Sequence, residues 1–104
     1  MIKTQIQGNL VKDPELKQID KERRVCVLTV ASNRIGKDSP DVLRVEVWNK
    51  SADNCAKYLK KGSGVFAAGD LDIDLYQKDD ETRIAVKLVN VQVEFTDRVS
   101  PSAK

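Results

Sequence analysis

The chain has 104 residues, of which 40% are hydrophobic and 33% are charged, and its formal net charge is +2. This length allows one domain with a modest core, and no apolar run approaches the roughly 18 residues of a membrane span. The N-terminal residues lack the apolar stretch and cleavage site of a signal peptide, so we expect a cytoplasmic protein that makes no membrane contact.

The residue types that most metal sites and many active sites need are missing. There is no histidine, and Cys26 and Cys55 stand far apart in the sequence without a CxxC pair. This pattern excludes the usual zinc sites, and we expect both cysteines to be buried, unbridged thiols. Without histidine the commonest general base is absent, so we expect neither an enzyme nor a cofactor.

The charges are distributed unevenly along the chain. Residues 1–61 hold 13 lysines and arginines against 8 acidic residues, whereas residues 62–104 hold 5 against 8. One region of the surface can therefore be locally basic although the whole chain is nearly neutral, as a nucleic-acid footprint requires. An ordinary mixed surface would give the same counts, and charge alone does not separate the two interpretations.

The first half of the chain alternates apolar and polar residues, which predicts half-buried strands. We expect strands from Ile2 to Leu10, from Arg24 to Asn33 and from Asp41 to Trp48, with a break at Pro14 after the first. The second strand is apolar on both faces: Cys26, Leu28 and Val30 lie on one and Val25, Val27 and Ala31 on the other. Because a barrel is filled by one face of each strand, the second apolar face predicts a packing partner.

The period then changes to that of a short helix. Ala52, Cys55, Ala56 and Leu59 form one apolar stripe at helical spacing. Ser51 is the predicted N-cap with Asp53 in the first turn, and Gly62 is the predicted left-handed stop.

Two further strands follow, from about Val65 to Tyr76 and from Ile84 to Phe95, joined by a polar tip over residues 77–82. In the first of these, Leu71, Ile73 and Leu75 are predicted to point inward and Asp70, Asp72, Asp74 and Tyr76 outward. In the second, the apolar phase shifts after Leu88, from Ile84 and Val86 to Val89, Val91 and Val93. Such a slip implies a β-bulge, which small barrels use to close.

The order of three strands, one helix and two strands predicts an all-β fold with small α content. We expect a five-stranded OB-fold Greek-key barrel with its helix between strands three and four. The barrel should occupy residues 1–96, and residues 97–104 should form a disordered C-terminal tail.

Three stretches resemble the bacterial single-stranded-DNA-binding protein family. They are Gly8-Asn9-Leu10 with Asp13-Pro14-Glu15, the segment from Ala56 to Ser63, and the strand from Val65 to Leu71. Their order and spacing match over roughly residues 1–95. The resemblance implies an OB barrel that assembles into a homo-oligomer, a tetramer before a dimer. It also implies binding of single-stranded DNA by base stacking on aromatic rings and by phosphate neutralisation.

The resemblance also assigns candidate DNA-binding positions, which are Trp48, Tyr76, Lys3, Arg34, Arg44, Lys50, Lys60 and Lys61. Two of the family's aromatic positions are lost, one at Val42 and the other near Ile35 or Gly36. Asp72 and Asp74 stand where many members carry basic residues. We therefore expect binding weaker than the family norm, or a DNA path displaced from this strand.

Other interpretations of these residues stay open. Trp48 could lie in an oligomer interface, Tyr76 could pack within its hairpin, and the lysines could be solvated charges at a helix end. Asp70, Asp72 and Asp74 could form a metal site, although period 2 is more typical of a solvated face. The main alternative function is a protein-interaction module similar to primosomal OB proteins. Residues 98–104 do not match the family's acidic C-terminal tail, so we expect no tail-mediated recruitment of partner proteins.

Overall fold

The computed structural model describes residues 1–97, so the predicted tail lies outside the described residues except for Asp97. Asp97 is held by the barrel, because its carboxylate accepts a hydrogen bond from the backbone N–H of Gly64 at 2.6 Å. The backbone N–H of Thr96 likewise donates to the carbonyl of Gly64. The last strand is therefore anchored through its final residues.

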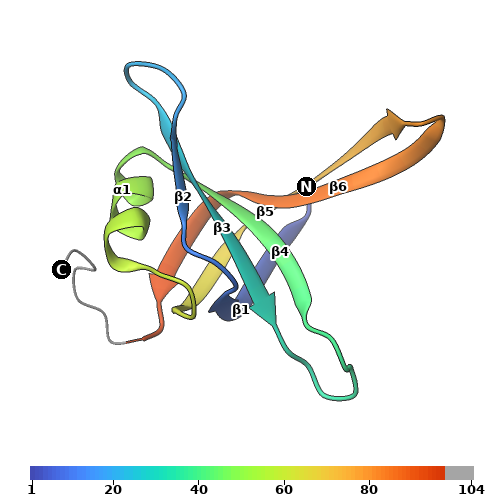
Figure 1. Cartoon of the computed structure of the whole chain (residues 1–104), viewed down its shortest axis with the longest axis horizontal. Helices are drawn as coiled ribbons and strands as arrows, with labels where there is room; N and C mark the ends of the chain where they lie inside the picture. The colour runs from blue at the N-terminus through green and yellow to red at the C-terminus, as the bar shows by residue number, and fades with distance from the viewer. Residues whose placement is uncertain (98–104) are drawn as a thin grey trace.

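Five strands close into a ring, as the alternation predicted (Figure 1). The order around the ring is β1–β5–β6–β4–β3, and β3 returns to β1. All pairings in the ring are antiparallel except β4–β6, which is parallel. The elements are β1 Lys3–Leu10, β2 Glu15–Gln18, β3 Arg24–Ser32, β4 Asp41–Trp48, α1 Asn49–Tyr58, β5 Gly64–Lys78 and β6 Glu81–Phe95. In chain order the helix lies between the third and fourth of these five strands, β4 and β5, so the predicted OB-type barrel is confirmed.

The short strand β2 was not predicted. It pairs antiparallel with β3 outside the ring, and all four of its residues are exposed. Strand signals depend on alternating burial, and a fully exposed strand of four residues carries none.

The barrel core consists of the inward faces of the ring strands and the apolar stripe of α1. Its fully buried members include Cys26, Leu28 and Val30 of β3, Val45 of β4 and Leu88 of β6; Ala52, Cys55 and Leu59 come from α1 and the residue after it. The helical stripe was therefore predicted correctly.

The predicted ends of the helix were wrong. The N-cap is Trp48, which makes no side-chain capping bond, and the first turn holds no acidic residue. The helix begins at Asn49, two residues before Ser51, and Asn49 itself has a left-handed φ of 53°. At the other end Gly62 does take a left-handed φ of 92°, but it lies in the turn before β5, and the helix ends at Tyr58.

The predicted phase slip is a β-bulge in β6. Ala68 of β5 pairs with Gln92, but Asp70 pairs with Val89, so β6 contains one extra residue. Asn90 lies at this position with a φ of 53°, and its amide donates to Asp70 at 3.0 Å. Asparagine tolerates the left-handed region better than most residues, which explains why the bulge forms there.

Beyond the ring, β5 and β6 continue as a two-stranded arm that projects from the barrel (Figure 1). β1 pairs with β5 only as far as Asp70, and β4 meets β6 only at Lys87 and Leu88. The predicted inward positions on this arm are therefore exposed: Ile73 46%, Leu75 70%, Ile84 63% and Val86 42%. The alternation was read correctly, but the strands outrun the core that would cover this face.

The second apolar face of β3 is already covered within one chain. Val25 and Val27 are 5% and 8% exposed. In register they lie between β2 and β4, opposite Lys17 and Glu15 on one side and Trp48 and Glu46 on the other. The expectation that a monomer would expose these valines was therefore wrong, since the unpredicted β2 borders them.

Both cysteines are free and buried, as predicted, and this gives a test of the core. Burial raises the pKa of Cys26 to about 11 and that of Cys55 to about 12. We expect a polar maleimide to label the native protein about 10³-fold or more slowly than the unfolded chain, because exposing a core thiol costs several kcal/mol.

The same pKa values set the pH dependence. Unfolded thiols titrate at about pH 8.5, so from that pH upward the unfolded chain loses protons first and the free energy of unfolding should fall. Native labelling should not accelerate between pH 7 and 9 in the way that labelling of the unfolded chain does. Fast native labelling with the ordinary thiol pH profile would contradict the buried assignment.

Candidate nucleic-acid interface

The outer surface of the ring carries the predicted aromatic and basic residues of β4. Because Val45 and Val47 point into the core, Arg44, Glu46 and Trp48 lie on the opposite face. Trp48 is 38% exposed and is paired in register with Val25. The tryptophan therefore presents part of its indole to solvent from a rigid strand end.

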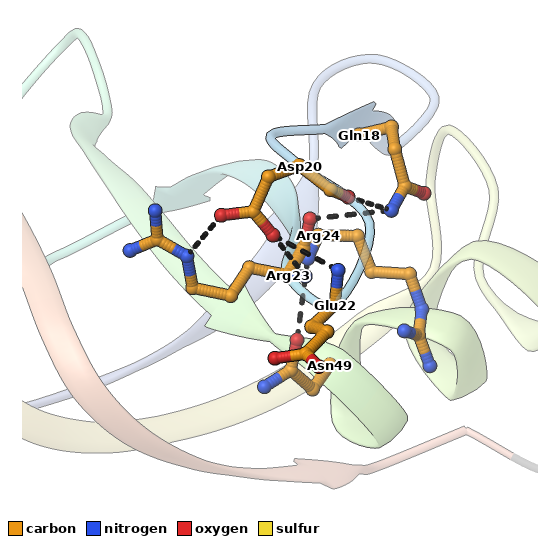
Figure 2. Close-up of polar contacts among 6 residues, drawn as sticks. All are labelled: Gln18, Asp20, Glu22, Arg23, Arg24 and Asn49. Atoms are coloured by element: carbon orange, nitrogen blue, oxygen red, sulfur yellow. Dashed lines mark hydrogen bonds and ion pairs between the residues drawn. The ribbon is translucent and has the colours of Figure 1, made fainter.

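The backbone around Trp48 is fixed by polar contacts between the start of β3 and the start of α1. Asn49 accepts a hydrogen bond from the backbone N–H of Arg24 at 3.2 Å, as Figure 2 shows. The Arg24 guanidinium also makes a two-pronged ion pair with Asp53, which holds the pKa of that carboxyl below its ordinary value. These contacts lie next to Trp48 in the sequence and in the sheet register, so they hold it in place.

The preceding β2–β3 turn is organised separately by Asp20. Its carboxylate accepts bonds from the backbone N–H groups of Glu22 and Arg23 and from the Arg23 side chain (Figure 2). The Gln18 amide donates to the carbonyls of Asp20 and Arg23. These hydrogen bonds all lie within the turn. The contact between Arg24 and Asn49 lies outside it and joins β3 to α1.

A groove of about 470 Å³ lies on the outer face between β4 and the arm. It is lined by Thr29, Val42, Arg44, Glu46, Asp74, Ala85, Val86 and Lys87. The lining combines small and apolar side chains with charged side chains of both signs. A flat base could lie on the apolar part while a phosphate meets the cations.

Lys87 is the residue of this groove that the sequence did not identify. It is the register partner of Arg44 across the parallel β4–β6 pairing, so two cations from distant segments are neighbours. The Lys87 ammonium also lies 3.3 Å from Glu46 and 4.0 Å from Asp72. A polar residue after Val86, which alternation predicted to point inward, is ordinary in a sequence, and only the pairing of β4 with β6 gives Lys87 significance.

Two predicted cationic positions are engaged by carboxylates. Lys3 lies 2.6 Å from Asp70, and Arg34 lies 3.3 Å from Asp41, which also pairs with Lys37. Hydrogen bonds from Lys3 and Asn90 lower the pKa of Asp70, and the bond from Lys37 lowers that of Asp41. Each carboxylate competes with phosphate for its cation.

The remaining predicted residues lie on three different elements. Lys50 is exposed on the first turn of α1, and Lys60 and Lys61 are exposed in the turn that follows this helix. That turn is rigid, because the backbone N–H of Lys61 donates to Asp13 at 2.8 Å and that of Lys60 donates to Ser63. Tyr76 is 45% exposed on the outer face of the arm, in register with Arg83. Of the eight predicted positions, Arg44 lines the groove, and the structure does not gather all eight into one cluster.

Within residues 1–97 no group of three or more potential ligands is placed to hold a metal ion, and no helix is long and apolar enough to cross a membrane. The Asp70 carboxylate in particular is bound to Lys3 and Asn90. Of the outward aspartates on β5, Asp70 and Asp72 thus form ion pairs, with Lys3 and Lys87 respectively.

Comparison with known proteins agrees with this architecture. The sequence model described as "Single-strand binding protein family" matches residues 1–96. "Single-stranded DNA-binding protein 1" of Clostridium acetobutylicum is 35% identical over 97 residues, covering 86% of this chain and 88% of the relative. "Single-stranded DNA-binding protein" of Chlamydia caviae is 38% identical over 86 residues, covering 81% of this chain but 53% of the relative.

The barrel also resembles a solved structure, "Plasmodium falciparum SSB complex with ssDNA", with a TM-score of 0.79 over 93% of this chain and 96% of that one. At 20% sequence identity this likeness concerns the OB fold alone. The family match spans nearly all of the described chain, and curated relatives exceed 30% identity. The chain therefore belongs to the single-strand binding protein family.

Proposed function

We propose that this chain binds single-stranded DNA, largely without regard to sequence and without catalysis, through its OB domain of residues 1–96. Trp48 supplies a stacking surface at the end of β4, and Arg44 with Lys87 neutralises phosphate at the groove between β4 and the arm. Tyr76, Lys3, Arg34, Lys50, Lys60 and Lys61 contribute further contacts. The observation that carries the proposal is that Trp48 is 38% exposed at the end of the β4 face that also holds Arg44, the register partner of Lys87.

This chemistry suits single strands because every base offers a π-face, whereas paired bases are stacked on one another. The proposed biological setting is replication, recombination, repair or DNA transfer in the bacterial cytoplasm. The proposed assembly is a homo-oligomer, a tetramer before a dimer. The valines of β3 do not support that assembly, because they are buried within one chain. Its support is the family membership.

A fluorescence titration tests the binding proposal. The chain contains one tryptophan, so quenching by oligo-dT at low salt reports directly on Trp48. We expect saturable quenching that is reversed by salt and is similar for oligo-dT and mixed-sequence strands. Duplex DNA of the same length should compete poorly. Absence of quenching together with absence of retention on single strands would refute the proposal.

A second candidate function is a protein-interaction module with weak single-strand binding, similar to primosomal OB proteins. It is favoured by the carboxylates that engage Lys3, Arg34 and Lys87. These ion pairs lower the positive potential that a DNA strand would meet. Micromolar or weaker affinity for oligo-dT at physiological salt, with intact fold and Trp48 exposure, would favour this candidate.

The acidic side chains of the arm give a prediction on DNA affinity. Asp72 lies at 4.0 Å from Lys87, and Asp74 lines the groove. Replacing both with lysine should tighten single-strand binding and steepen its salt dependence, because each new phosphate contact adds about 0.7 to the slope of log K against log salt. The measurement is a salt series of oligo-dT titrations.

The matched control for this pair is Asp79→Lys with Asp80→Lys, which makes the same charge change at the turn of the arm. If the control variant gained as much affinity for oligo-dT, the tighter binding would be due to net charge alone. Unchanged affinity and slope in the Asp72/Asp74 variant would place the DNA path away from this part of the arm.

A further inference from the structure

The last five residues of β6, residues 91–95, are paired with a strand on only one side. β4 pairs with β6 only at Lys87 and Leu88, and the bulge at Asn90 bends β6 directly afterwards. β5 pairs with one side of residues 91–95, and no other strand among residues 1–97 pairs with the opposite side (Figure 1). We call this opposite side the β6 edge.

The register shows which backbone groups the β6 edge presents. The backbone N–H of Thr96 donates to the carbonyl of Gly64, so Thr96 directs its backbone groups toward β5. Alternate residues of an antiparallel strand turn their N–H and C=O groups to the same side. The residues whose backbone groups face the β6 edge are therefore Val91, Val93 and Phe95. Within residues 1–97 these groups make no hydrogen bond on that side, so they form a template for another extended chain.

A groove of about 730 Å³ lies along the β6 edge, between β6 and α1. Its helix side includes Ser51, Asn54 and Tyr58, and its sheet side includes residues 91–95. The ring centroids of Tyr58 and Phe95 lie 6.2 Å apart, so the groove has an aromatic contact where both elements end. A further strand would lie about 4.8 Å from β6, and this groove provides the place for it.

We propose that the β6 edge binds an extended peptide segment of a partner protein, which joins the sheet beside β6. Side chains on one face of this segment meet Val93, Phe95 and Tyr58, so they are apolar. The other face of the segment lies beside Glu94, the one charged side chain among the described residues that line the groove. Its carboxylate favours lysine or arginine at the cross-strand position. The ligand is thus a strand in which aliphatic and basic residues alternate.

The β6 edge is separate from the proposed DNA-binding surface. None of the proposed DNA-binding residues lines this groove within the described part of the chain. A DNA strand is also a poor occupant, because its phosphates would meet the carboxylate of Glu94. The peptide proposal therefore does not depend on DNA binding, and quenching of Trp48 by oligo-dT judges the DNA proposal on its own.

Amide hydrogen exchange followed by NMR tests the edge in the free protein. The amides of Val91, Val93 and Phe95 should exchange about tenfold or more faster than those of Gln92 and Glu94, since only the latter two are hydrogen-bonded to β5. Equal protection of all five amides would overturn the proposal, because the edge would then be covered.

The binding test uses a fluorescein-labelled peptide, Thr-Val-Lys-Val-Arg-Val, and fluorescence anisotropy. We expect saturable binding that protects the three edge amides from exchange. Val93→Pro removes an N–H from the edge without breaking a hydrogen bond to β5. It should bind the peptide about tenfold or more weakly than Val93→Ala, which loses the same side chain but keeps the N–H. A peptide with glutamate in place of lysine and arginine should bind more weakly to the parent.

Three outcomes would overturn the proposal. They are no saturable binding up to about 1 mM peptide, equal affinity of folded Val93→Pro and Val93→Ala, and binding to the parent that leaves the edge amides unprotected. The last of these decides the matter even if Val93→Pro does not fold. A mass that rises with protein concentration in the parent and Val93→Ala but not in Val93→Pro would assign the edge to a second copy, which would also overturn it.

Discussion

Trp48→Ala should weaken binding of single-stranded DNA more than any single lysine replacement. Stacking of a base on an aromatic ring contributes about 1–3 kcal/mol in single-strand binding proteins, which corresponds to a loss of roughly 5- to 150-fold in affinity. An exposed phosphate contact is screened at physiological ionic strength and should contribute less. The loss should be similar for oligo-dT and for mixed sequences, because stacking reads no base edges.

The measurement is a competition assay with labelled oligo-dT on Trp48→Ala, Trp48→Phe, Arg44→Ala and Lys61→Ala. Trp48→Phe is the matched variant, because it keeps a stacking face and should retain most of the affinity. Each protein must first show the parent's melting temperature and mass, since Trp48 precedes α1 and is paired with Val25. If Trp48→Ala binds like the parent, the indole serves packing or an interface, and the protein-interaction function becomes the better proposal.

The fold could be predicted from the sequence because each ring strand carries its own signal. Alternation identified the inward residues of β3 and β4, and helical spacing identified Ala52, Cys55 and Leu59. The phase slip after Leu88 predicted the bulge, because an extra residue must invert the alternation of the strand that contains it.

The errors on the arm and on β3 share one physical cause, which is that periodicity reports the face of a residue but not what lies over that face. Leu75 and Val27 both occupied the face that alternation assigned to them. Yet Leu75 is exposed because the arm outruns the barrel, and Val27 is buried in a strand flanked by β2 and β4. Whether a strand face is covered depends on the tertiary arrangement. The strand β2 could not be predicted from the sequence, because its burial does not alternate.

The same reasoning explains which site residues could be foreseen. Trp48 and Arg44 were identifiable because their outward direction follows from Val45 and Val47 on the same strand. Two other features depend on pairings between strands that are distant in the sequence. Asp70 competes with phosphate for Lys3, and Arg44 lies next to Lys87. Those pairings determine how much free positive charge the surface offers, so the affinity for DNA could not be inferred from the motifs.

The largest expected effect on stability is at Gly8, where the ring closes. Gly8 lies on β1 just before Asn9 and Leu10, which pair with Ala31 and Val30 of β3. A Cβ at Gly8 would overlap the carbonyl oxygen of Ala31, with the carbonyl carbon at 2.8 Å and the Cα of Ser32 at 3.2 Å. These are backbone atoms, so the clash cannot be relieved by a change of rotamer.

Gly8→Ala should therefore force β1 and β3 apart at the point that closes the barrel. We expect the free energy of unfolding to fall by about 1–3 kcal/mol or more, the range for overpacked sites, and Gly8→Val should be worse. The measurement is urea unfolding monitored by circular dichroism. The slope of the unfolding free energy against urea concentration should match that of the parent, as a two-state transition requires. Gln7→Ala is the matched control, because the neighbouring side chain is exposed and its loss should change stability by less than about 0.5 kcal/mol.

Since Trp48 lies on the far side of β3 from β1, a Gly8→Ala protein that still folds should keep its quenching by oligo-dT. An unchanged unfolding midpoint would mean that β1 and β3 are not in backbone contact at this position, and the ring would then be open.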